Sequence, residues 1–346
     1  MFLGVLAIYF STACRTIYTG DDGDFASAIA TLGIPHPTGY PLFVLLGKLW
    51  ITLTFFLGSI PFRLNLLTAT CGAGAVAVLY RFLSELLAGL SWRRVWAVVG
   101  ALLFAFSPTM WNQSSSCEVY APNVLFLSLL LFFSVQFVRA ESGDQANKKL
   151  CLLALTYGFA LTNHISIALF FPAFMAMVLW RKPSLFGKDW QILLAVVGCL
   201  FLPLSLYIYF PLAAKFSSSP NKWGYPDTPE RFWAHVTGEQ YRSVMFISSH
   251  LWKEGVRSYL SSLLPHEYGA LLLLAAVAGL IFLLWRSQTR VPALLLTAVL
   301  LCNVVYSAGY HIVDIFVYYV PSYLVLAVLI ASAGAGLVYL LETKLG

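Results

Sequence analysis

Three carboxylates stand close together near the start of the chain, just after its first apolar run. They are Asp21, Asp22 and Asp24, and the stiff run Pro35-His36-Pro37 follows them. A carboxylate within hydrogen-bond reach of a hydroxyl can take its proton as the oxygen attacks. A single aspartate here would be read as a helix cap. Three of them beside an apolar segment favour a site, because ionisable groups near membrane depth are costly.

The composition is that of a membrane protein with many spans. Apolar residues make up 60% and charged residues 10% of the 346 positions, whereas about a quarter of a soluble domain is charged. The net charge of +6 is modest and does not suggest a nucleic-acid partner. The six cysteines show no metal-binding or redox spacing. The N-terminal apolar run lacks a basic start and a clean cleavage site, so we expect a retained span.

The apolar runs predict an all-α fold with about ten transmembrane helices in a single domain over residues 1–346. Residues 19–39 form the first outer loop, which carries juxtamembrane helices, and residues 211–268 form a long outer loop. Lengths near 20 residues suit a span. We expect Tyr40–Leu57 to be half-buried or re-entrant, and Leu150–Trp180 to break at Asn163-His164. The other expected spans are Met1–Tyr18, Leu64–Leu87, Val95–Phe106, Val119–Val138, Gln191–Phe210, Gly269–Trp285, Val291–Ser307 and Phe316–Leu341.

The short basic loops predict the orientation of these spans. Lysine and arginine in short loops favour the cytosol, and clusters occur at Arg93-Arg94, Arg139 with Lys148-Lys149, Arg181-Lys182 with Lys188, and Arg286 with Arg290. The acidic loop, the 107–120 turn, Asn163-His164, the 211–268 loop and residues 308–314 then meet on the other face.

Several polar residues on that outer face are candidates for substrate binding, and each has a simpler reading. Glu118 could instead simply cap a helix, and Asn163-His164 could instead simply hydrogen-bond between helices. Arg231 and Arg242 have the fork geometry that suits a phosphate. Trp223, Trp233 and Tyr241 offer flat faces for a sugar or for the membrane interface. Asp314 could close the site from the far end of the chain or cap the last helix.

A series of motifs along nearly the whole chain resembles one family. They are GDDGDF, LGIPHPTGYPLFVLLGK, RLNLLTA, SPTMWNQSSSCEVYAPN, GFALTNHISI and KWGYPDTPERFWAHVTGEQYR. In this order they resemble the transmembrane-protein-260 family of protein O-mannosyltransferases and its bacterial relatives, which belong to the GT-C membrane glycosyltransferases. The family pattern Asp-x-Gly-Glu is matched by Asp21 and Gly23, with Asp24 in place of the glutamate.

The resemblance implies a sugar, mannose in the better-known relatives, moved from a polyprenyl-phosphate donor to an acceptor hydroxyl on a protein or glycan. The transfer would invert the anomeric carbon at the non-cytosolic face, which is periplasmic, extracellular or ER lumenal. Asp21, or Asp24 as second choice, would be the catalytic base. No cofactor and no metal is expected. The implied substrate-binding residues are Asp22, His36, Tyr40, Glu118, Tyr120, Asn163, His164, Trp223, Arg231, His235, Tyr241, Arg242 and Asp314.

Two other classes of function fit some of the same features. A transporter or flippase of lipid-linked sugars would need ionisable residues near the bilayer midplane and, often, an internal repeat. No convincing repeat is visible, and the polar residues gather at one face. A non-catalytic membrane subunit would use the long outer loop to bind a partner.

Overall fold

The computed structural model describes residues 1–345, and this part of the chain is helical, with isolated β-bridges and no strand. The all-α prediction is therefore confirmed. The α-helices are α1 (Phe2–Thr12), α2 (Asp22–Thr31), α3 (Pro41–Leu53), α4 (Ile60–Leu86), α5 (Arg93–Ala105), α6 (Pro108–Gln113), α7 (Tyr120–Arg139), α8 (Gly143–Asn163), α9 (Phe171–Arg181), α10 (Trp190–Leu204), α11 (Tyr209–Phe216), α12 (Pro229–Val236), α13 (Ser249–Ser258), α14 (Leu264–Tyr268), α15 (Ala270–Trp285), α16 (Arg290–Ala308) and α17 (Val320–Leu345). Short turns of other helix types are η1 (Ile165–Phe170), η2 (Pro183–Phe186), η3 (Ser205–Ile208), η4 (Glu239–Val244), η5 (Tyr259–Leu263) and η6 (Ile315–Tyr319).

Fewer helices than the predicted ten are long and apolar enough to cross a membrane alone. Within residues 1–345, five candidates reach that length, and a sixth arises if the pair Ser249–Tyr268 and Ala270–Trp285, bent by 97°, counts as one span. The five are Ile60–Leu86, Tyr120–Arg139, Trp190–Phe216, Arg290–Ala308 and Ile315–Lys344. The count of ten is thus not confirmed. Helix α3 has 13 residues, about 20 Å, and is too short to span, as expected for a half-buried segment.

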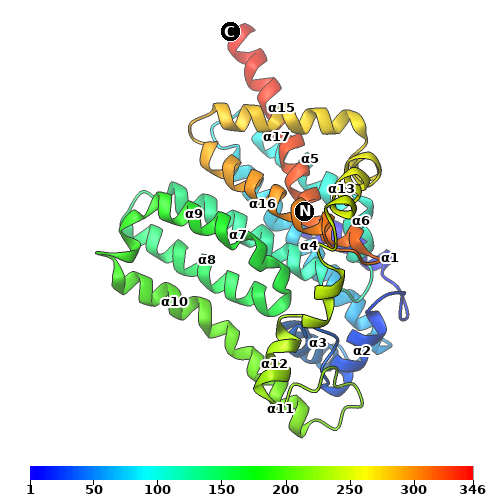
Figure 1. Ribbon diagram of the computed structural model, residues 1–346. Helices are drawn as coiled ribbons and strands as arrows, with labels where there is room; N and C mark the ends of the chain where they lie inside the picture. The colour runs from blue at the N-terminus through cyan, green and yellow to red at the C-terminus, as the bar shows by residue number, and fades with distance from the viewer. Residues whose placement is uncertain (346) are drawn as a thin grey trace.

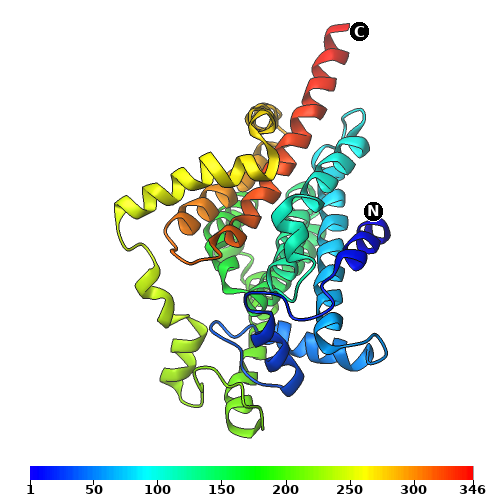
Figure 2. The same cartoon turned by 90° about the vertical axis from the view of Figure 1, so that its right-hand side faces the viewer.

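The core is built around α4 and α7, which pack against each other, with α8, α5, α17 and α15 added around them (Figure 1). Figure 2 shows α4 as a long helix running from the N-terminal loops to the opposite end of the bundle. Ser59 caps the start of α4 by accepting a hydrogen bond from the Phe62 N–H, and Pro61 lies in the first turn. The long span Trp190–Phe216 is apolar, yet only 6% of it is buried by protein, as expected of a helix that faces lipid.

The break predicted inside Leu150–Trp180 is present. Helix α8 ends at Asn163, and His164 adopts an extended backbone with φ −155° and ψ 123°. The His164 Nδ1 accepts a hydrogen bond from the Ser166 N–H at 3.1 Å, which caps the turn that follows. The chain then reverses into α9.

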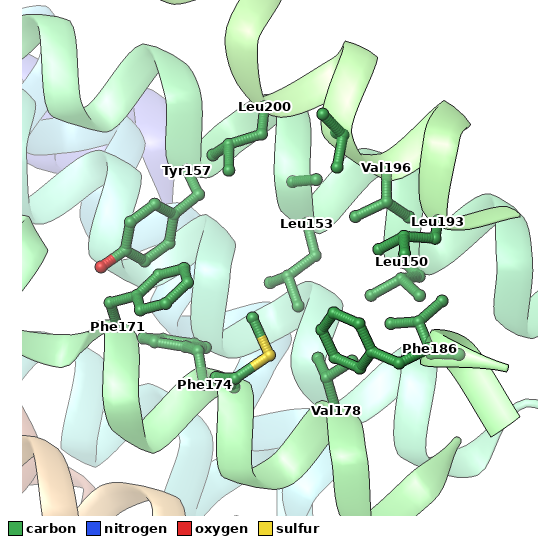
Figure 3. A pocket seen from close by; sticks show the side chains of 14 residues that line it. Leu150, Leu153, Tyr157, Phe171, Phe174, Val178, Phe186, Leu193, Val196 and Leu200 are labelled. Atoms are coloured by element: carbon green, nitrogen blue, oxygen red, sulfur yellow. The ribbon is translucent and has the colours of Figure 1, made fainter. Parts of the chain in front are cut away.

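Helices α8, α9 and α10 enclose an apolar cavity of about 220 Å³. Figure 3 shows side chains such as Leu153, Phe174 and Val196 around it, while the Tyr157 hydroxyl points away. That hydroxyl donates to the Ile167 carbonyl oxygen at 2.6 Å. The lining offers no group that could do acid–base chemistry, so this cavity is not the candidate active site.

Two sets of contacts place the acidic loop. At its start, the buried Asn65 amide of α4 donates to the carbonyl oxygens of Cys14 and Thr16, at 2.8 and 3.2 Å. At its end, Ile34 forms a parallel bridge with Lys222 of the long outer loop. The Ile34 N–H donates to the Asn221 carbonyl at 2.8 Å, and the Trp223 N–H donates to the Ile34 carbonyl at 2.9 Å. Figures 1 and 2 show α2 and α3 beside α11 and α12.

Because α8 packs closely on α10, replacing two glycines by alanine should change the free energy of unfolding in opposite directions. A Cβ at Gly158 would collide with the Leu200 carbonyl oxygen and lie 3.0 Å from Pro203, whereas a Cβ at Gly198 meets nothing within 4 Å. We expect Gly158→Ala to lower the free energy of unfolding by about 1–3 kcal/mol. Gly198→Ala should raise it by up to about 1 kcal/mol, because alanine favours the helix. Thermal unfolding in detergent measures both, and equal effects would contradict this packing.

Candidate active site

The three aspartates of the acidic loop point to different places. Asp21 precedes α2, and its side chain is 48% exposed at the edge of a cavity. Asp22 is buried, and its Oδ2 accepts a hydrogen bond from the Tyr18 N–H at 3.1 Å, which fixes the loop before α2. Asp24 lies in the first turn of α2 and turns toward His36.

Asp24 holds His36 in one orientation. The Asp24 Oδ2 lies 2.7 Å from His36 Nδ1 and accepts the His36 backbone N–H at 2.8 Å. With Asp24 ionised, Nδ1 carries the ring proton, so Nε2 faces the cavity. The His36 Nε2 lies 3.0 Å from the Tyr40 hydroxyl and 3.5 Å from Asp21 Oδ2. The imidazole therefore connects two of the three aspartates.

Asn221 of the long outer loop completes this network. Its Nδ2 donates to Asp24 Oδ1 at 2.7 Å and to the Asp24 carbonyl oxygen at 3.2 Å. Both carboxylate oxygens of Asp24 are thus bonded, Oδ2 to His36 and Oδ1 to Asn221. Burial tends to raise the pKa of Asp24, but the hydrogen bonds from His36 and Asn221 outweigh it and lower the pKa below its ordinary value.

The cavity beside Asp21 has a volume of about 350 Å³ and is assembled from segments far apart in the sequence. Its floor and walls combine three carboxylates, one imidazole and five tyrosine rings, which suits a polar ligand with flat faces. The lining residues are Gly20, Asp21, Phe25, His36, Pro37, Tyr40, Glu118, Val119, Tyr120, Tyr241, Tyr310, Ile312, Val313, Asp314 and Tyr318.

Two carboxylates of this cavity, Asp21 and Glu118, have raised pKa values. Burial raises the pKa of Asp21, Asp314 and Asp24 raise it further, and His36 opposes them. Burial, followed by the charges of Asp21 and Asp22, raises the pKa of Glu118 well above its usual range. A protonated Glu118 can donate a hydrogen bond while a less buried Asp21 ionises, which is how neighbouring acids come to have different roles.

The structure brings about half of the predicted site residues to the cavity. Those that line it are Asp21, His36, Tyr40, Glu118, Tyr120, Tyr241 and Asp314. His164 lies behind it, with its ring 5.5 Å from those of Tyr40 and Tyr120. Asn163 donates to the Val119 carbonyl at 3.2 Å and so supports the Glu118 segment. The Trp223 ring lies 6.4 Å from that of His36.

The remaining predicted residues do not line the cavity. Arg231 binds Asp227 at 2.9 Å and Arg242 lies 3.6 Å from Glu239, and both guanidinium groups are mostly exposed. His235 is buried against the Phe210 ring at 5.2 Å, and burial, together with the nearby His36, lowers its pKa to about 4. His235 is therefore neutral at pH 7. The predicted phosphate contacts of the two arginines stay predictions.

Three residues of the site were not singled out by the sequence. Tyr310 and Tyr318 line the cavity, with their rings 5.1 Å apart, and Asn221 binds Asp24. Tyr310 is close to Asp314 in the sequence, and Asn221 directly precedes the KWGYPD stretch, so their positions gave a weak signal. Tyrosines are frequent at membrane interfaces, and nothing in their type separates a site residue from a belt residue.

A comparison with family models decides the relationship of this stretch. Residues 21–186 match the N-terminal domain of the protein O-mannosyl-transferase TMEM260. These residues are similar to the N-terminal domain of TMEM260. The match begins at Asp21 and includes His36, Tyr40, Glu118, Tyr120 and His164, so the resemblance seen in the motifs is confirmed.

Two curated relatives agree with this relationship. The mouse protein O-mannosyl-transferase TMEM260 is 31% identical over 251 residues, which are 72% of this chain and 35% of the mouse protein. The Dictyostelium discoideum protein of the same name is 25% identical over 255 residues, or 70% of this chain and 30% of that protein. The chain thus spans about a third of the length of these TMEM260 relatives.

Solved structures show that the chain has the GT-C fold. ArnT from Cupriavidus metallidurans, bound to undecaprenyl phosphate, matches 96% of this chain and 59% of its own with a TM-score of 0.68 at 17% identity. An Archaeoglobus fulgidus oligosaccharyltransferase, in complex with zinc and sulfate, matches 99% of this chain and 50% of its own with a TM-score of 0.60 at 16% identity. The predicted GT-C architecture is therefore confirmed.

The hydrogen bonds to Asp24 predict how its contribution depends on pH. The folded pKa of Asp24 is lowered, so its stabilisation is present above the unfolded value, near pH 4, and is lost as the pH falls through the folded pKa. We expect Asp24→Asn to cost about 2 kcal/mol at pH 7. The difference from the unsubstituted protein should shrink below pH 4. Thermal unfolding at pH 7 and pH 3 measures it, and a constant difference would contradict the ionised Asp24.

Proposed function

We propose that this chain is a membrane glycosyltransferase that moves a hexose from a polyprenyl-phosphate donor to an acceptor hydroxyl with inversion. The observation that carries the proposal is the half-exposed Asp21 carboxylate. It lies at the mouth of a tyrosine-lined cavity, 3.5 Å from a histidine that Asp24 orients. The match of residues 21–186 to the TMEM260 domain supports the same reaction.

Asp21 is the catalytic base in this proposal, and Asp24 is a positioning residue. A base must have a free oxygen within reach of the substrate, and Asp21 lines the cavity while Asp24 is occupied by His36 and Asn221. Asp21 accepts the proton of the acceptor hydroxyl as its oxygen attacks the anomeric carbon. The bond to the lipid phosphate breaks on the opposite side, which inverts that carbon.

The leaving phosphate is stabilised by donors already in the cavity. His36 Nε2, when protonated, offers a cationic donor, and the hydroxyls of Tyr40, Tyr241 and Tyr310 add neutral ones. Preorganised donors of this kind contribute most where water is excluded. The undecaprenyl phosphate in the ArnT structure supports a prenyl-phosphate donor for this fold.

The names of the TMEM260 relatives support mannose as the sugar and a protein hydroxyl as the acceptor. Mannose transfer to protein is accordingly the specific form of the proposal, with the bilayer and the lipid-linked sugar as the other partners. The predicted absence of a metal or cofactor stays a prediction. Among residues 1–345, no group of three or more His, Cys, Asp or Glu side chains is placed to hold a metal ion.

The active site belongs on the non-cytosolic side in this proposal. The basic loops gather at the other end of the bundle. The guanidinium of Arg181 donates to the Val138 and Ala140 carbonyls, and Lys149 donates to Gln136. Their position opposite the cavity is what the positive-inside tendency favours. The multi-pass, integral membrane character of the chain agrees with this placement.

Removing the base should abolish transfer. We expect Asp21→Asn to reduce kcat by about 10²–10⁴-fold, because an amide cannot accept the hydroxyl proton. Asp144→Asn, an exposed acid in the first turn of α8, is the matched control and should keep full activity. The measurement is mannose transfer from a synthetic polyprenyl-phosphate mannose by the purified chain.

The outcomes of this measurement separate the three functional classes. Full activity of Asp21→Asn would contradict its role as the base. No transfer by the unsubstituted chain, together with translocation of the lipid-linked sugar in vesicles, would favour a flippase. If the unsubstituted chain shows neither sugar transfer nor translocation unless another protein is added, a non-catalytic subunit is favoured.

The carboxylate cluster predicts the acidic limb of the pH profile. Asp21 works only when ionised and its pKa is raised, so kcat should fall as the pH drops through a value above the ordinary 3.8. Asp314 contributes to that rise. Asp314→Asn removes a negative neighbour and should move the acidic limb to lower pH. A profile measured from pH 4 to pH 8 checks this, and an unchanged limb would show that Asp314 does not act on the base.

A further inference from the structure

A second polar cavity lies at the opposite end of α7 from the candidate active site. Tyr120, the first residue of α7, lines the active-site cavity, and Arg139, the last, lines the second one. The twenty residues of α7 separate the two by about 30 Å, the thickness of the hydrocarbon core. The second cavity has a volume of about 350 Å³.

This second cavity is strongly basic. It is lined by Arg81, Arg93, Arg94 and Arg139, with Glu85 as its single acid, so four positive charges and one negative charge leave +3. The Glu85 carboxylate accepts a hydrogen bond from the Gln136 amide at 3.2 Å. Arg286 adds a further charge close by, because its Nη2 would lie 3.9 Å from a Cβ at Gly89. Like charges this close repel unless an anion joins them.

Only one of the four lining arginines has a structural partner. Arg139 donates to the carbonyl oxygens of Glu85 and Leu86, where α4 ends. The side chains of Arg81, Arg93 and Arg94 make no hydrogen bond or ion pair within residues 1–345; Arg81 and Arg94 are exposed, and Arg93 is partly exposed. Arg139 and Arg181 are partly buried and bond to carbonyl oxygens, whereas the three other guanidinium groups remain available to an anion.

The helix that carries two of these arginines adds to the positive field. Arg93 and Arg94 open α5, and its first turn contains no acid. A helix N-terminus carries a partial positive charge and favours anions, so two cations there are unfavourable by themselves. A phosphate group would satisfy both the arginine forks and the free N–H groups of the first turn.

We propose that this cavity binds a phosphate group at the membrane surface opposite the active site. Its position, where two spanning helices end and α5 begins, fits the headgroup of an anionic lipid, since basic residues next to spans attract such headgroups. A free phosphate ester would offer the same oxygens. The inference does not depend on the proposed sugar transfer, because it uses none of the active-site residues.

The test is a binding titration of the full chain in neutral detergent. The probes are dihexanoyl phosphatidylglycerol, dihexanoyl phosphatidylcholine and inorganic phosphate. We expect the phosphatidylglycerol to bind and the phosphatidylcholine not to bind. The paired change Arg93→Gln with Arg94→Gln should weaken binding about 30-fold, because each charge near the surface contributes roughly fivefold.

A matched control separates the cavity from the general positive charge of this face. Lys148 and Lys188 are exposed, belong to the basic clusters of the same face and do not line the cavity. Lys148→Gln with Lys188→Gln removes the same charge and should leave binding unchanged. Arg81→Gln provides a second variant if the paired change fails to fold, and it should weaken binding about fivefold.

Each result has a defined meaning. Inorganic phosphate binding as tightly as phosphatidylglycerol, with the same loss in the arginine variants, supports the site and identifies a soluble phosphate as the ligand. Equal weakening by the arginine pair and the lysine pair would overturn the proposal, because unspecific attraction would then explain the binding. Absence of binding by both anions would overturn it as well.

Discussion

The candidate site depends on the bonds that hold Asp24 between His36 and Asn221. Asp24 and His36 come from the acidic loop, whereas Asn221 lies about 200 residues later in the chain. Together with the backbone bridge from Ile34 to Lys222, these bonds dock the long outer loop onto the acidic loop. Without them the imidazole would rotate freely, and the outer loop would lose its main polar attachment. The cavity is therefore shaped by a few charge-assisted hydrogen bonds on top of an apolar bundle.

Much of this architecture follows from the sequence, because lipid imposes strong rules. The hydropathy pattern predicted an all-helical membrane protein, the break at Asn163-His164 and the short helix α3. The number of spans could not be predicted from hydropathy alone. Helices α1 and α5 have only 11 and 13 residues, and whether such short helices cross the membrane depends on their neighbours. Length alone separates a span from a shorter apolar helix only when the helix reaches about 20 residues.

The sequence pointed to the charged residues of the candidate cavity and to three of its five tyrosines, Tyr40, Tyr120 and Tyr241. Carboxylates next to apolar segments are rare in membrane proteins, so Asp21, Glu118 and Asp314 stood out, and all of them line the cavity. Tyr310 and Tyr318 did not stand out among 18 tyrosines. The sequence could not separate the roles of Asp21 and Asp24. Either of two acids three positions apart at the start of a helix can face the cavity, while the other faces a supporting histidine. The phosphate contacts predicted for Arg231 and Arg242 stay predictions, and in this structure both guanidinium groups lie beside local acids.

The last segments of the chain have a consequence for biogenesis. Asp314 and Tyr318 complete the cavity that Asp21 opens, and they precede the final helix, α17. During synthesis the early aspartates reach the membrane long before these partners are made. A partly translated chain consequently lacks the side of the cavity that Tyr310, Asp314 and Tyr318 form. The complete cavity therefore forms only after the segment before the last helix has been made.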